Sequence, residues 1–194
     1  MEKTEQIVDT KSNKRKSTTK HLIICGIFAA LAAVCSQIQI PLPMVPINLA
    51  LFAVHMSGAL LGAKLGTISM LVYVLLGAVG APVFSGFTGG FGTLAGPTGG
   101  YIIGYILCAF IVGIICDKWG RAIPKMALAM VLGVICCYTF GTAWFMIVMK
   151  MGLWESLLAC VFPFLIGDAV KIVLAILLTN ALRKPLSKAG WIIG

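Results

Sequence analysis

Charged residues are scarce in this chain. They make up 11% of its 194 residues, whereas 60% of the residues are hydrophobic. Soluble domains contain about 25% charged residues, and a small domain has too much surface to hide such an apolar surplus from water. The main solvent of the chain is therefore lipid. One membrane crossing takes roughly 20 residues, so residues 21–184 have room for six spans but for no soluble domain.

The motifs of intramembrane and nucleotide-using enzymes are also missing. The sequence has no HExxH zinc motif and no GxSG serine-protease motif, and no lysine follows its glycines as a phosphate-binding loop requires. The segment 165–168 lacks the first glycine of the GxGD aspartyl proteases, and the predicted spans hold no second aspartate. We therefore expect no catalysis, no ATP use and no cofactor. We interpret His21 and His55 as polar packing residues.

Cysteine is present but not in any pattern that binds metal. The seven cysteines all fall in apolar stretches, without CxxC or other metal-ligand spacing. We interpret them as small hydrophobic residues of the core or of the lipid-facing surface. Cys136 and Cys137 are adjacent and point to different helix faces, so they do not predict a disulfide.

The hydrophobic runs predict an all-α membrane protein with six transmembrane helices. Residues 1–20 are polar and predict a disordered basic tail, residues 21–184 form the membrane domain, and residues 185–194 form a short C-terminal tail. Prolines, glycines and charged residues separate the apolar runs. The predicted spans are 22–40, 47–63, 65–80, 99–116, 126–149 and 156–182.

The positive charges predict the orientation, because Lys and Arg concentrate on the cytoplasmic side. With the N-terminal tail inside, six basic residues of the tail, Lys64, three residues within 118–125 and three within 183–188 are cytoplasmic, which is thirteen of the fifteen. Lys150 lies outside and Lys171 lies within a span. Both termini are therefore expected in the cytoplasm, and the loops 41–46, 81–100 and 150–155 outside.

The segment 81–100 is unusually rich in glycine. Irregular backbone at membrane depth is tolerated where protein or a water-filled cavity satisfies its polar groups, and glycine lets a ligand approach the backbone closely. The segment therefore predicts one wall of a binding site, with a flexible external loop as the alternative. The glycines that would form this wall are Gly86, Gly89, Gly90, Gly92 and Gly96.

Asp168 is the only acidic residue inside a predicted span. A charge near the bilayer centre costs roughly 2.5–3.5 kcal/mol on insertion scales and usually marks a functional site or a pairing. Lys171 lies three residues later, on the same helix face, and Pro163 suggests that a helix starts or kinks just before this pair. The two residues predict a polar site on the outer side of the membrane, and the alternative is a pair that only neutralises itself.

Small residues recur at four-residue spacing in the first three predicted spans. Gly58, Gly62 and Gly66 predict close packing between helices inside the protein. Ala29 and Ala33 predict a face on which a partner protein docks, with internal packing as an equal alternative.

Taken together, these residues resemble the BioY family, the biotin-binding subunits of energy-coupling-factor (ECF) transporters. The resemblance covers nearly the whole span region, and the GPTGGY stretch is its most specific part. The residues that carry it are Val45-Pro46-Ile47, Gly58 to Gly62 with Leu65-Gly66, Gly80 to Phe84, Gly89-Gly90, Gly96 to Tyr101, and Gly167-Asp168 with Lys171.

The resemblance implies six helices in a bacterial cytoplasmic membrane and an external biotin pocket. It also implies partners: a transmembrane coupling protein and two ATPases. In the family, the glycine-rich loop and the last-helix aspartate are thought to hold the ureido ring, which would place Thr88, Gly89, Gly90 and Asp168 around it. We expect apolar walls from Phe84, Val83, Phe87 and Tyr101.

Two departures from the family concern the biotin carboxylate. Some relatives carry a basic residue where this chain has Ile102, and many carry a glutamine where it has Ala50. Lys171 or Lys150 could take that role, or the carboxylate could face water. The alternative functions are a subunit for another vitamin, such as thiamin or riboflavin, or a membrane scaffold without transport.

Overall fold

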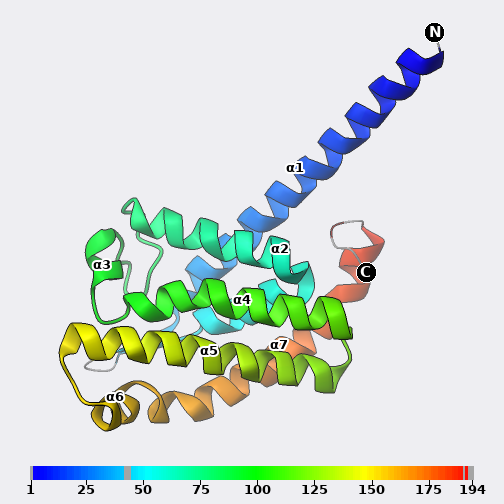
Figure 1. Ribbon diagram of the computed structural model, residues 1–194. Helices are drawn as coiled ribbons and strands as arrows, with labels where there is room; N and C mark the ends of the chain where they lie inside the picture. The colour runs from blue at the N-terminus through cyan, green and yellow to red at the C-terminus, as the bar shows by residue number, and fades with distance from the viewer. Residues whose placement is uncertain (1, 42–44, 190, 192–194) are drawn as a thin grey trace.

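The computed structural model describes residues 2–41, 45–189 and 191 (Figure 1). They form an all-helical bundle with one antiparallel pair of two-residue strands. The helices are α1 (Glu2–Gln37), α2 (Ala50–Ala78), α3 (Phe91–Ala95), α4 (Gly99–Trp119), α5 (Ile123–Met149), α6 (Leu153–Cys160) and α7 (Phe162–Lys188), and the strands are β1 (Gln39–Ile40) and β2 (Ile47–Asn48).

Within these described ranges, five helical segments are long and apolar enough to cross a membrane. They are Thr19–Gln37 of α1, together with α2, α4, α5 and α7. The protein is therefore a multi-pass membrane protein, but the predicted count of six separate spans is not confirmed. The difference arises because the predicted spans 47–63 and 65–80 belong to the single element α2.

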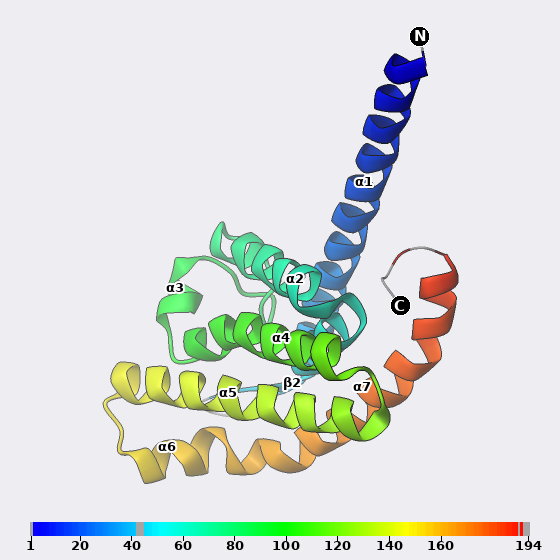
Figure 2. The same cartoon turned by 45° about the vertical axis from the view of Figure 1, so that its right-hand side comes forward.

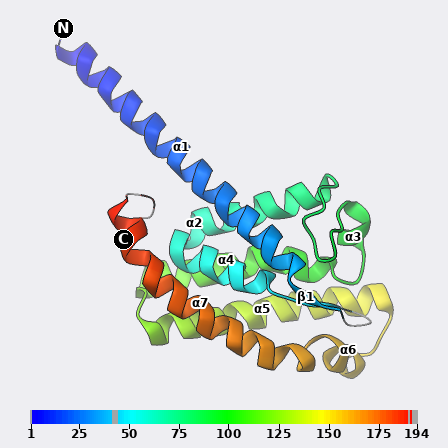
Figure 3. The same cartoon turned by 180° about the vertical axis from the view of Figure 1, so that it is seen from behind.

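Gly62 explains why α2 was expected as two helices. Its φ of 78° and ψ of −178° are non-helical and interrupt the element. The two arms of α2 on either side run in opposite directions (Figures 1 and 3). They pack closely, because a Cβ atom added at Gly66 would lie 2.8 Å from the carbonyl oxygen of Ser57. The predicted break at residues 63–65 thus lies one residue beyond the observed elbow.

The N-terminal segment also differs from its prediction. The structure gives helix from Glu2 onward, where the sequence predicts a disordered tail over residues 1–20. The segment contains no proline or glycine that would end a helix, so α1 continues from the membrane span into it. This part of α1 projects away from the bundle (Figure 2). The division of the chain into a tail and a membrane domain stays a prediction.

Helix α4 lies at the centre of the bundle and packs against α2 and α5. Glycines permit the close approach: a Cβ atom at Gly58 would lie 2.7 Å from the carbonyl oxygen of Ala109, and one at Gly113 would lie 2.4 Å from the backbone nitrogen of Ala63. The predicted internal packing of the glycine ridge is confirmed. Both termini lie at the elbow end of the bundle, whereas α3 and α6 lie at the opposite end (Figures 1 and 3).

Candidate ligand-binding site

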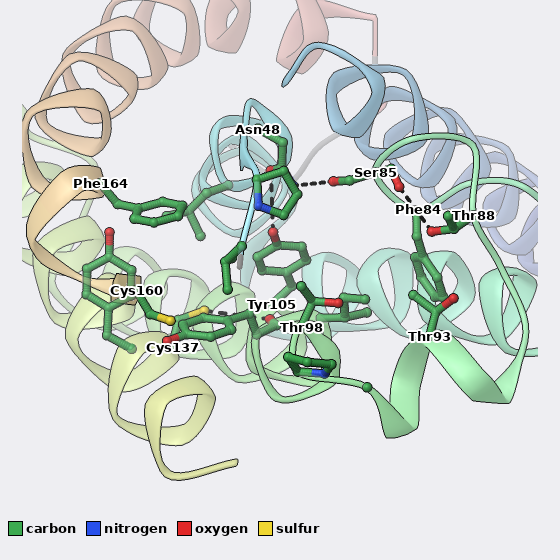
Figure 4. Close-up of a pocket in the computed structure, with 18 of the residues that line it drawn as sticks. Asn48, Phe84, Ser85, Thr88, Thr93, Thr98, Tyr105, Cys137, Cys160 and Phe164 are labelled. Atoms are coloured by element: carbon green, nitrogen blue, oxygen red, sulfur yellow. Dashed lines mark hydrogen bonds between the residues drawn. The ribbon is translucent and has the colours of Figure 1, made fainter. Parts of the chain in front are cut away.

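A cavity of about 430 Å³ opens at the end of the bundle that carries α3 and α6. This volume lies within the roughly 300–1,000 Å³ range of small-molecule sites. Its walls come from β2, α2, the segment 84–98, α4, α5, α6 and α7, so residues far apart in the chain meet here (Figure 4). Most of the wall is apolar, with aromatic rings from Tyr73, Phe84, Tyr101 and Phe164.

The charged part of the wall comes from the start of α7. Val161 precedes this helix and Pro163 stands in its first turn, where proline needs no hydrogen-bond partner. The predicted helix start before Asp168 is confirmed. The helix then places Asp168 and Lys171 on one face, where the Lys171 Nζ donates to the Asp168 Oδ1 at 2.7 Å. Both residues are buried, with 4% and 6% of their surface exposed.

Tyr138 of α5 completes this charged group. Its hydroxyl donates to the Oδ2 atom of Asp168, so each carboxylate oxygen has a partner. A buried charge needs such partners, because taking it out of water without them is costly. Sequence reasoning missed Tyr138, since a tyrosine in a long apolar run gives no signal that it faces an aspartate on another helix.

A second, uncharged polar group lies across the cavity at the start of α2. The Asn48 Oδ1 accepts from the backbone N–H of Ala50 at 3.0 Å, while the Asn48 Nδ2 donates to the Ser85 Oγ at 2.5 Å. The Tyr105 hydroxyl donates to the same Asn48 Oδ1 at 3.5 Å. Sequence reasoning missed these residues too, although an asparagine just before an apolar helix is a signal for a helix start.

The glycine-rich segment is held against the bundle by α1. The Ser36 hydroxyl donates to the carbonyl of Val83 at 2.5 Å. The Gln37 amide donates to the carbonyl of Phe84 at 3.0 Å and accepts from the backbone N–H of Phe87 at 2.9 Å. These hydrogen bonds and the short helix α3 within the segment favour the interpretation as a wall of a binding site over that of a flexible loop.

The structure brings most of the predicted site residues to the cavity. Those that line it are Phe84, Thr88, Gly92, Gly96, Tyr101, Asp168 and Lys171. Among them, the Thr88 hydroxyl donates to the carbonyl of Ser85 at 3.0 Å, and the ring of Phe84 packs edge-on against Tyr73 with centroids 5.6 Å apart.

Other predicted residues do not reach the cavity wall. Gly89 and Gly90 are not among its lining residues, and a Cβ atom at Gly89 would lie 2.3 Å from the carbonyl oxygen of Ala81. That glycine therefore lets the segment pack against itself. Phe87 is 72% exposed and Val83 does not line the cavity, so the apolar-wall prediction is wrong for these two. Ile102 does line it.

The predicted docking pair on α1 also needs correction. Ala29 is only 2% exposed because α1 packs against α2 on this face, so a partner could not reach it. Ala33 is half-buried. Two small residues of α1 that do face outward are Gly26 and Ala30, and no atom from elsewhere lies within 4 Å of a Cβ built at Gly26.

His55 and the cysteines lie inside the bundle or partly covered by it, as expected for packing residues. His55 is fully buried, with its Nδ1 atom 3.8 Å from the Sγ of Cys108. All seven cysteines are free and buried or half-buried. Cys137 and Cys160 line the cavity (Figure 4), where their thiols add to its apolar surface.

Comparison with known proteins gives consistent matches along the chain. The family model described as the BioY family matches residues 9–188. The biotin transporter BioY of Thermotoga maritima is 40% identical over 167 residues, which cover 85% of this chain and 96% of the relative. The probable biotin transporter BioY of Pyrococcus horikoshii is 36% identical over 164 residues, which cover 84% and 96%.

A solved structure shares the fold. It is a crystal structure of the S-component for biotin from an ECF-type ABC transporter, and it matches with a TM-score of 0.81 at 29% sequence identity. The match covers 87% of this chain and 93% of the other. The relatives are thus named as transporters, which agrees with the expectation that the chain is not an enzyme.

Proposed function

The chain belongs to the BioY family, and we propose that it is the biotin-binding S component of an ECF-type transporter. One observation carries this proposal: a single cavity joins a buried carboxylate and ammonium with an aromatic wall. Biotin has the complementary chemistry, because a polar ureido ring is fused to an apolar thiophane ring with an aliphatic chain. Like the rest of the family, the chain would bind biotin without changing it and without a cofactor.

The polar groups of the cavity match the ureido ring. Its two N–H groups need acceptors, and Asp168 offers carboxylate oxygens. Its carbonyl needs donors, which the Thr88 hydroxyl or backbone N–H groups of the glycine-rich segment can supply. Phe84, Tyr101 and the other aromatic rings line the cavity and would flank the apolar part of the ligand. A buried site built for these hydrogen bonds rejects analogues that lack them, because its own polar groups would stay unpaired.

Isothermal titration of the purified protein in detergent tests the substrate. We expect saturable heat with biotin at micromolar concentration and none with thiamin or riboflavin. The Asp168→Asn variant is the matched control, because it keeps the size of the side chain but removes its charge. A protein that binds thiamin or riboflavin but not biotin would refute the proposal, and one that binds none of the three would favour a scaffold.

We further propose that the chain works with a coupling module of a transmembrane protein and two ATPases, because its sequence holds no nucleotide-binding motif. The outward-facing small residues Gly26 and Ala30 of α1 allow a partner helix to approach closely. Ala30→Trp should then block co-purification of the module and leave biotin binding intact. Ile166→Trp is the control, because Ile166 is 80% exposed on α7. Equal co-purification of both variants would contradict this docking face.

We propose that the protein lies in the bacterial cytoplasmic membrane with both termini inside. Two observations support this orientation: the thirteen basic residues on the inner side of the predicted topology, and the position of the cavity at the end of the bundle away from both termini. The cavity would then open to the outside. A C-terminal fluorescent-protein fusion should be bright and an alkaline phosphatase fusion inactive; the reverse result would invert the topology.

A further inference from the structure

Asp168 receives hydrogen bonds from two different helices. The Lys171 Nζ reaches the Oδ1 atom from the same helix, at 2.7 Å. The Tyr138 hydroxyl reaches the Oδ2 atom from α5. Tyr138 also lines the cavity, so the bond between α5 and α7 forms directly beside the space for the ligand.

A lysine on the same helix cannot fix the plane of the carboxylate by itself. The terminal torsion of an aspartate is broad, and the long lysine side chain can follow its rotation. A second partner on another helix removes this freedom. Each carboxylate oxygen has about two lone pairs, so one on each oxygen stays available after Lys171 and Tyr138 have bound.

The Tyr138 ring is itself held in place. It packs edge-on against Tyr101, with centroids 6.5 Å apart and an interplanar angle of 78°. Tyr101 shares a hydrogen bond of 3.0 Å with the hydroxyl of Thr142, one helical turn after Tyr138 on α5. The phenol that meets Asp168 therefore belongs to a connected group of α4 and α5 side chains, which limits its movement.

From this geometry we propose that Tyr138 is a positioning residue, which aims the carboxylate of Asp168 at an N–H donor of the ligand. The proposal rests on the proposed function, because it assigns the ureido N–H of biotin to Asp168. It predicts that Tyr138 contributes to the affinity only through that contact. A tyrosine that merely satisfied a buried charge would stabilise the fold and would not alter ligand selectivity.

The test compares Tyr138→Phe with the wild type by titration of purified protein with biotin. A hydrogen bond contributes about 0.5–1.5 kcal/mol, or more to a charged group, and 1.4 kcal/mol is tenfold in affinity. We expect a loss of about five- to tenfold. In an Asp168→Asn background the same change should have little further effect, because the charge that it positions is gone. Tyr138→Phe should weaken the binding of ureido-N-methylated biotin less than it weakens the binding of biotin, because the methyl group removes the N–H that would donate to Asp168.

Two further variants separate positioning from structure. Ser57→Ala removes a buried hydrogen bond elsewhere, from the Ser57 hydroxyl to the carbonyl of Val54, at a residue that does not line the cavity, and should leave biotin affinity within twofold. Replacement of Tyr138 by 4-aminophenylalanine keeps the ring and a donor at the same place, so it should restore most of the affinity. This variant also tests the proposal if Tyr138→Phe folds poorly.

The outcomes distinguish this inference from the proposed function. If the wild type binds no biotin, both are overturned. If the wild type binds biotin and Tyr138→Phe binds it equally well, only the role of Tyr138 is overturned. The same holds if the fold-losses from Tyr138→Phe and Asp168→Asn multiply fully in the double variant, or if Ser57→Ala weakens biotin binding as much as Tyr138→Phe does.

Discussion

An ion pair lies at each end of the bundle, and the two pairs use their charges differently. Asp168 and Lys171 at the cavity are 5% and 8% exposed at the side chain. Asp117 in the last turn of α4 and Arg121, just after that helix ends, are 43% and 11% exposed at the side chain. The inner pair is enclosed by helices α5 and α7, whereas the outer pair lies between the elbow of α2 and solvent.

The outer pair binds backbone groups of the elbow. The Asp117 Oδ2 accepts from the backbone N–H of Ala63 at 2.8 Å, just after Gly62, and the Arg121 Nε donates to the carbonyl of Ala59 at 2.7 Å. These are groups that a helix end leaves without partners. At the cavity, the carboxylate of Asp168 instead contacts two side chains and keeps lone pairs for a ligand. A pair of one acidic and one basic residue thus satisfies free backbone groups at the elbow, whereas at the cavity such a pair holds a carboxylate that can still accept from a ligand.

The largest effect is expected from Gly62→Ala at the elbow. A positive φ combined with a ψ near 180° is essentially restricted to glycine and costs another residue about 1–3 kcal/mol, and the new Cβ would lie 2.6 Å from both carboxylate oxygens of Asp117. We expect the unfolding free energy in detergent to fall by about 2–4 kcal/mol. Gly80→Ala is the matched control, since its φ is 103° with no atom within 4 Å of the added Cβ. An equal loss in both variants would show that Asp117 does not contribute.

Asp168→Asn should have the next largest effect, and on affinity rather than on the fold. A hydrogen bond to a charged group contributes roughly 1.5–3 kcal/mol, and 1.4 kcal/mol is tenfold in affinity. We therefore expect biotin binding to weaken about ten- to a hundredfold, with the protein still folded and inserted. Titration gives the affinity and thermal unfolding the stability. Unchanged biotin affinity would rule out Asp168 as part of the site.

Lys171→Met distinguishes two roles for the lysine. If Lys171 binds the biotin carboxylate, its removal should weaken biotin several-fold more than biotin amide, which lacks that charge. If it only neutralises Asp168, removal should weaken both ligands equally and lower the melting temperature, because a buried carboxylate loses its partner. Parallel titrations with the two ligands decide between these outcomes. No change with either ligand would place Lys171 outside the site.

The sequence predicted the elements of the fold better than their connections. Apolar runs located the helices, and the turn near Ala63 was found because Lys64 interrupts an apolar run. The reversal of direction between the two arms of α2 depends on the positive φ of Gly62. Glycine permits a positive φ, but its presence in the sequence does not predict one. The predicted span 156–182 joins the end of α6 to α7, because the residues around Val161 are apolar and no charged residue separates the two helices, although the backbone breaks at Val161.

The site was predictable where a residue was chemically out of place. Asp168 stood out as an acid within a span, and the structure puts it in the cavity. Tyr138 and Asn48 could not be found in the same way, because their role depends on which side chain of another helix they meet. The docking prediction for Ala29 is wrong for a related reason. Residue spacing shows that small residues share one helix face, but not whether that face points into the bundle or away from it.

The smallest effect is expected from Asp117→Asn, because an exposed ion pair contributes only about 0–1 kcal/mol. The amide can still accept from the backbone N–H of Ala63, so the elbow should keep that contact and lose only the charge opposite Arg121. We expect the unfolding free energy to fall by about 0.5 kcal/mol and biotin affinity to stay within twofold. Added salt should narrow the difference between wild type and variant, since salt screens exposed charges. Thermal unfolding at low and high salt measures this. A loss of biotin affinity in Asp117→Asn would instead show that the elbow and the cavity are coupled, which would contradict the view that the two ion pairs act independently.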